Sequence, residues 1–80
     1  MNNAKSKKQW LGETTCVVCG LAEPRQLVDG RTRNGYWAIM CTECHREHGR
    51  GLGLGKGQLY ERNAFEEMLK GRPVYEKVEG

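Results

Sequence analysis

Long apolar runs are missing from this 80-residue chain, in which apolar residues make up only 38% of the sequence. No stretch approaches the roughly 18 apolar residues that a membrane-spanning helix needs, so we expect no membrane partner. A chain this short, with 11 glycines, does not offset its conformational entropy by core burial alone. We therefore expect one small domain that needs a further cross-link to fold.

Cysteine is absent outside two Cys-x-x-Cys pairs, Cys16 with Cys19 and Cys41 with Cys44, and 21 residues separate the pairs. Two pairs at about this spacing are typical of a closed tetrahedral site of four thiolates, which suits zinc and leaves no position open for a substrate. We predict one structural Zn²⁺ ion held by these four cysteines. The ion then supplies folding free energy, so the metal-free chain is expected to be largely unfolded.

Two disulfides or an iron–sulfur centre are the alternatives for the same four cysteines. Disulfides require an oxidising compartment, and residues 1–12 contain no apolar signal segment ahead of Cys16. A redox Cys-x-x-Cys motif needs a thioredoxin-like βαβ unit, which the sequence does not indicate. These features favour zinc and a cytoplasmic location.

The remaining pattern predicts a small α+β domain over residues 13–72, between a flexible basic N-terminus (1–12) and a tail (73–80). Residues 74–80 of this tail are expected to be loose or to form a short edge strand. Gly20 follows the first pair and allows the turn of a zinc knuckle. Strand-like segments at 26–28 and 36–40 are separated by the turn signals Asp29-Gly30 and Asn34-Gly35. In the N-terminus, Trp10 and Leu11 are expected to fold back as a lid over the core, and the alternative for Trp10 is an exposed contact residue.

Two helices are expected after the hairpin. The first covers residues 42–48, with Thr42 as its N-cap and an end at Gly49. The second runs from about residue 60 to 70 and ends at Gly71. Its apolar stripe is expected to contain Leu59, Phe65, Met68 and Leu69.

Residues 49–57, between these helices, have glycine at every second position. They do not form a Walker A loop, because Arg50 and Gly57 occupy places where that motif needs glycine and a hydroxyl residue. We favour close packing of this segment around the knuckle, with Leu52 and Leu54 buried on alternate sides. The alternative is a mobile loop whose amides, with Arg50 and Lys56, hold phosphate.

Basic residues gather in two parts of the chain. Residues 1–12 contain three lysines and no acid, and residues 25–56 contain six bases against three acids. This distribution favours an anionic partner. The candidate contact residues are those near the hairpin tip and in the glycine-rich segment: Arg31, Arg33, Arg50, Lys56 and Trp37, the last of which is also expected in the core. His45 and His48 are not expected to be metal ligands.

The order of knuckle, hairpin and second Cys-x-x-Cys at a helix start, over residues 14–48, resembles the treble-clef zinc finger, with the zinc ribbon as the alternative. Residues 34–45, NGYWAIMCTECH, also look like the closing half of a His-Asn-His endonuclease motif. That family cleaves DNA with a histidine on the first hairpin strand, and no histidine lies between the two cysteine pairs here. We therefore expect no enzyme activity.

The stretch from Asp29-Gly30-Arg31-Thr32 to residues 53–58, GLGKGQ, is similar to small zinc-finger proteins of bacteriophages and bacterial mobile elements. That resemblance implies a source and no established activity. The leading hypothesis is a non-enzymatic module that binds nucleic acid. The alternative is a phage-encoded module that binds a host protein in the bacterial cytoplasm.

Overall fold

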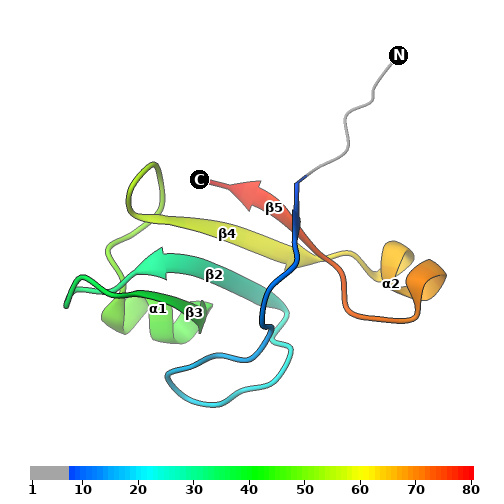
Figure 1. Cartoon of the computed structure of the whole chain (residues 1–80), viewed down its shortest axis with the longest axis horizontal. Helices are drawn as coiled ribbons and strands as arrows, with labels where there is room; N and C mark the ends of the chain where they lie inside the picture. Colours follow the sequence, from blue (N-terminus) through cyan, green and yellow to red (C-terminus); the bar gives the residue numbers. More distant parts are fainter. Residues whose placement is uncertain (1–7) are drawn as a thin grey trace.

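A five-stranded antiparallel sheet with two short helices forms the fold of the computed structural model, which describes residues 8–80 (Figure 1). The strand order across the sheet is β1-β5-β4-β2-β3. Along the chain the elements are β1 (Gln9–Trp10), β2 (Gln26–Arg31), β3 (Trp37–Cys41), α1 (Thr42–His48), β4 (Gly57–Arg62), α2 (Ala64–Lys70) and β5 (Tyr75–Glu79). The prediction of a small α+β domain is confirmed.

The β2–β3 hairpin is longer than expected because Asp29 and Gly30 continue the strand. Gly30 pairs with Gly57 of β4, and a Cβ atom on Gly30 would lie 3.3 Å from the Gly57 Cα. This close approach of two backbones explains why glycine stands inside a strand. The turn forms only at the second signal, where Gly35 has a φ of 96° and donates its N–H to Thr32.

The predicted helix over residues 60–70 is wrong in its first part. Tyr60 lies in β4, where it pairs with Leu27 of β2, so the local helical pattern yields to strand pairing. The helix α2 starts one residue after Asn63, whose side chain accepts a hydrogen bond from the Glu66 N–H at 3.0 Å. It ends as predicted at Gly71, which has a φ of 69°.

Both ends of the chain differ from the expected flexible N-terminus and tail. Residues 75–79 form a strand, β5, but it lies between β1 and β4 and not at the edge of the sheet. Tyr75 is completely buried, and its hydroxyl donates to the Pro24 carbonyl. The β1 residues pair with β5, while residues 1–7, including Lys5 and Lys7, lie outside the described part of the chain.

Two small cores lie on the sheet. One contains Leu27, Tyr60 and Tyr75, and Trp10 packs on it as predicted for a lid, with its ring centroid 5.5 Å from that of Tyr60. The same prediction is wrong for Leu11, which is 81% exposed. The other contains Met40 and three of the cysteines beside α1. None of the helices in residues 8–80 is long and apolar enough to cross a membrane.

Candidate functional site

The four cysteines come from three local structures that meet at one place. Cys16 and Cys19 belong to the first knuckle (residues 16–20), which closes through a hydrogen bond from the Gly20 N–H to the Cys16 carbonyl at 2.9 Å. Cys41 is the last residue of β3 and also the N-cap of α1, one residue before the predicted cap. Cys44 lies in the first turn of α1.

A backbone bond joins the first knuckle to the hairpin. The Val17 N–H donates to the Ile39 carbonyl of β3 at 2.9 Å. Since Cys41 ends the same strand, this bond sets the distance between the two cysteine pairs. In the folded domain, the hairpin thus holds the first knuckle close to Cys41 and Cys44.

The cysteine sulfurs all lie within 4.8 Å of one another, and Cys19 Sγ is 3.8 Å from Cys41 Sγ. Four sulfurs at the usual Zn–S distance of about 2.3 Å would be about 3.8 Å apart at the corners of a tetrahedron. The four cysteines are therefore positioned to bind one metal ion. Within residues 8–80 the cluster contains neither His45 nor His48, as expected.

The environments of the thiols differ strongly. Burial acts to raise the pKa of Cys16, but the N–H groups of Cys19, Cys41 and Val18 outweigh it and lower that pKa to about 6. Burial, followed by hydrogen bonds with the other thiols, raises the pKa of Cys44. The Cys16 thiol therefore loses its proton more readily than the Cys44 thiol.

His45 connects the cysteine cluster to the glycine-rich segment. Its Nε2 donates to the Gly51 carbonyl at 3.0 Å, and its ring lies directly over Gly49. A Cβ atom at Gly49 would overlap that ring and lie 2.7 Å from the His45 carbonyl oxygen. The φ angle of Gly49 is −93°, so its backbone is not left-handed and would accept any residue. The contact with His45 therefore explains why α1 ends at a glycine.

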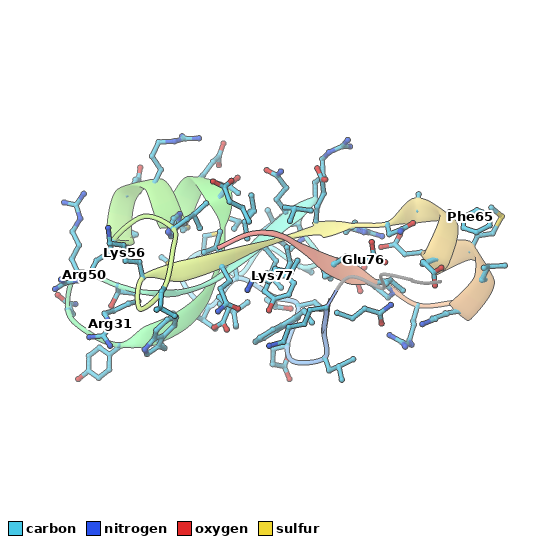
Figure 2. All side chains as sticks on the ribbon, turned by 90° about the horizontal axis from the view of Figure 1, so that it is seen from above. Arg31, Arg50, Lys56, Phe65, Glu76 and Lys77 are labelled. Atoms are coloured by element: carbon cyan, nitrogen blue, oxygen red, sulfur yellow. The ribbon has the colours of Figure 1, made fainter. Side chains whose placement is uncertain are left out.

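An open hollow of about 1170 Å³, the basic hollow, lies between α1, the glycine-rich segment and the hairpin turn. Its charged walls contain a single acid, Glu79, and five bases: Arg31, Arg33, Arg46, Arg50 and Lys56. Figure 2 shows Arg31, Arg50 and Lys56 at the end of the molecule opposite Phe65 of α2. Four of the five predicted contact residues thus meet in one place, and their role in binding stays a prediction.

Two residues of this region differ from the sequence-based expectation. Trp37 is 47% exposed instead of buried in the core, and the Arg31 guanidinium lies 5.7 Å from its ring centroid. Arg46 lines the basic hollow but was not selected as a contact residue. The sequence feature that could have identified Arg46 was its position in the predicted helix, two residues after Cys44.

The arginines of the basic hollow are held in different ways. Arg50 donates from Nε to the Thr32 carbonyl at 3.2 Å and from Nη2 to the Arg33 carbonyl at 3.0 Å. This fixes the glycine-rich segment against the hairpin turn. Arg31 has a buried Nε that finds no hydrogen-bond partner among residues 8–80. Its guanidinium therefore has unused donor capacity.

The glycine-rich segment is a bent loop and does not show the expected close packing of both leucines. Leu54 is 96% exposed, so the two leucines are not buried on alternate sides. Gly51, Gly53 and Gly55 have φ angles of 92°, 124° and 77°, which residues with a side chain rarely adopt.

No protein-family model, curated protein or solved structure matches the chain.

Proposed function

We propose that this chain is a non-enzymatic, zinc-dependent module of treble-clef type that binds nucleic acid through the basic hollow. The single observation that carries the proposal is the ratio of five bases to one acid around that hollow. Lysine and arginine clusters of this kind neutralise the phosphates of nucleic acid.

The order of elements supports the treble-clef assignment. The first knuckle is followed by the β2–β3 hairpin and then by α1, which carries Cys44 in its first turn. In a zinc ribbon the second pair would lie in the turn of a second hairpin instead. The positive end of the α1 dipole would also favour the thiolate form of Cys44 once metal is bound.

Zinc fits the donor set, and a structural role fits the chemistry. Four thiolates complete a tetrahedral shell, so no site would remain at the ion for water or a substrate. No histidine between Cys19 and Cys41 is available as the base that a His-Asn-His nuclease needs. The ion would hold the hairpin, α1 and the glycine-rich segment in one arrangement.

Backbone donors add to the side-chain charges. In residues 8–80, no backbone hydrogen bond uses the N–H groups of Gly51, Leu52 or Gly55, which line the basic hollow. Unpaired N–H groups in a bent glycine-rich loop are suited to hold anions. Lys5 and Lys7, outside the described residues, add two positive charges to the chain.

Binding is tested by fluorescence anisotropy with labelled oligonucleotides at several salt concentrations. We expect affinity to fall steeply with salt, and the double variant Arg33→Glu/Lys56→Glu to bind much more weakly. Lys70→Glu/Arg72→Glu is the matched control, because it changes the net charge equally and both residues are exposed and do not line the basic hollow. No binding at low salt, or equal loss in the control, would refute the proposal. Zinc content and circular dichroism confirm that each variant is folded.

The second candidate is a module that binds a host protein, as a bacteriophage product acting in the bacterial cytoplasm would. The observation in its favour is the apolar face of α2, where Phe65, Met68 and Leu69 are 64%, 76% and 67% exposed. No residue of α2 is buried. A pull-down from bacterial lysate, with and without nuclease, separates the two candidates, since a protein partner survives nuclease treatment.

A further inference from the structure

A second, smaller hollow of about 380 Å³ adjoins the basic hollow, and Arg33 lines both. The second hollow lies between the hairpin turn, the first knuckle and the end of α1. Its walls are formed by Val18, Thr32, Arg33, Asn34, Tyr36 and His48. The two hollows therefore adjoin at Arg33, and the chemical nature of their walls differs on its two sides.

The walls of the second hollow differ chemically from those of the first. Tyr36 is 75% exposed and Val18 is 45% exposed, so an aromatic ring and an aliphatic side chain face the solvent there. Asn34 and His48 add groups that can donate or accept hydrogen bonds. No acid lines the second hollow, so nothing in it repels a phosphate bound next to Arg33.

An exposed aromatic side chain beside arginine is the combination that proteins use to stack nucleobases. Tyr36 is free to act in this way, because the only hydrogen bonds to the residue in the described chain involve its backbone carbonyl. The turn that carries Tyr36 is itself held in place. Thr32 donates to that carbonyl from Oγ1 at 3.0 Å and from its N–H at 2.7 Å.

We propose that the ligand is single-stranded nucleic acid, with a backbone phosphate in the basic hollow and the adjoining base against Tyr36 in the second hollow. This inference rests on the proposed nucleic-acid binding and names its substrate class. A paired base has both faces covered by its neighbours in the duplex and cannot reach Tyr36 without being extruded. Arg33 lies at the junction, where it contacts the link between phosphate and base.

The test compares zinc-loaded full-length protein with a single-stranded oligonucleotide and with a duplex of the same sequence and length, at one salt concentration. Both DNA and RNA forms are used. We expect tighter binding to the single strand, and a loss of about 5- to 150-fold in that affinity for Tyr36→Ala. Tyr36→Phe should retain the affinity, because stacking needs the ring and not the hydroxyl.

Phe65→Ala is the matched control, since Phe65 is an exposed aromatic residue at the opposite end of the molecule. It should leave the affinity unchanged. Equal binding to duplex and single strand, or an unchanged affinity for Tyr36→Ala, overturns the inference. If the inference is overturned but Arg33→Glu/Lys56→Glu still weakens binding, the proposal of nucleic-acid binding stands without the preference for single strands. Absence of binding to every oligonucleotide at low salt refutes both.

Discussion

His45 Nε2 lies 3.0 Å from the carbonyl oxygen of Gly51 and donates a hydrogen bond to it. His45 directly follows Cys44 in α1, whereas Gly51 belongs to the loop that lines the basic hollow. One side chain therefore links the cysteine cluster to the proposed binding surface. The ring also fills the space over Gly49, so the helix end and the loop are positioned together.

We expect His45→Ala to loosen the loop without removing the metal. The variant loses the bond to Gly51, which is worth about 1 kcal/mol. Amide hydrogen exchange in residues 51–57 should therefore become faster, while native mass spectrometry still finds one zinc per chain. His48→Ala is the control, because His48 is exposed and its only described ion pair, with Glu47, is 3.7 Å long. Loss of zinc in His45→Ala would instead identify His45 as a ligand.

Metal removal is expected to unfold the domain. Purified protein should contain one zinc ion per chain. A chelator should remove this ion and abolish the tertiary structure, which is followed by NMR peak dispersion. Cys44→Ser should prevent folding, whereas Val17→Ser, at an exposed position of the same centre, should not. A mass lower by about four hydrogens would indicate two disulfides, and visible absorbance would indicate an iron–sulfur centre.

Zinc affinity should increase with pH. Burial and hydrogen bonds with the other thiols raise the pKa of Cys44, so this thiol is protonated at neutral pH and must lose its proton to bind zinc. Each proton displaced increases the affinity by up to about tenfold per pH unit. The backbone N–H groups that lower the pKa of Cys16 to about 6 leave this thiol largely ionised at pH 7. Chelator competition at pH 6.5, 7.5 and 8.5 measures how the zinc affinity changes with pH. An affinity that is the same at all three pH values would contradict the expectation.

Trp10 should contribute to stability although it lies near the N-terminus. Its ring packs on Tyr60, and its indole Nε1 donates to the Glu13 carbonyl at 2.7 Å. Since the ring is only partly buried, we expect Trp10→Ala to cost ~2 kcal/mol, less than the 3–5 kcal/mol of a fully buried tryptophan. Leu11→Ala, next to it and 81% exposed, should change nothing measurable. Urea denaturation in excess zinc gives both values, and equal values would exclude the lid role.

Glu67 should stabilise the C-terminal end of the fold. Its carboxylate accepts two hydrogen bonds from Arg62, at 2.7 and 3.0 Å, and one from the Val74 N–H at 3.1 Å. The Arg62 bonds, against an opposing effect of burial, lower the pKa of Glu67, so the carboxylate is ionised at pH 7. We expect Glu67→Gln to cost ~1–3 kcal/mol in urea denaturation at pH 7.

Glu66→Gln provides the comparison for Glu67, because Glu66 lies on the same helix and, within residues 8–80, its carboxylate pairs only with exposed Lys70, at 3.7 Å. That substitution should cost at most ~0.5 kcal/mol. A Glu67→Gln variant as stable as Glu66→Gln would show that the Arg62 pair contributes little. The comparison is made at constant pH, because acid would also protonate the cysteines.

Local signals were enough to predict α1 and the first knuckle. Gly49 and the spacing of the cysteines act within a few residues, so their meaning does not depend on distant parts of the chain. The strand β4 was missed, and β5 was expected only as an edge-strand alternative to a loose tail, for the opposite reason. Tyr60 pairs with Leu27, and Tyr75 is buried by contacts with segments far away in sequence, such as Pro24. Strand propensity depends on such partners.

The sequence alone determined which atoms can hold the metal, because four thiols in two Cys-x-x-Cys pairs have few other uses in one short chain. Only the tertiary structure decided which residues share a surface. Arg31, Arg46 and Lys56 come from a strand, a helix and a loop, and they meet because the sheet register and the His45–Gly51 bond bring those elements together. Side chains that are distant along the chain become one site only when the backbone between them is folded.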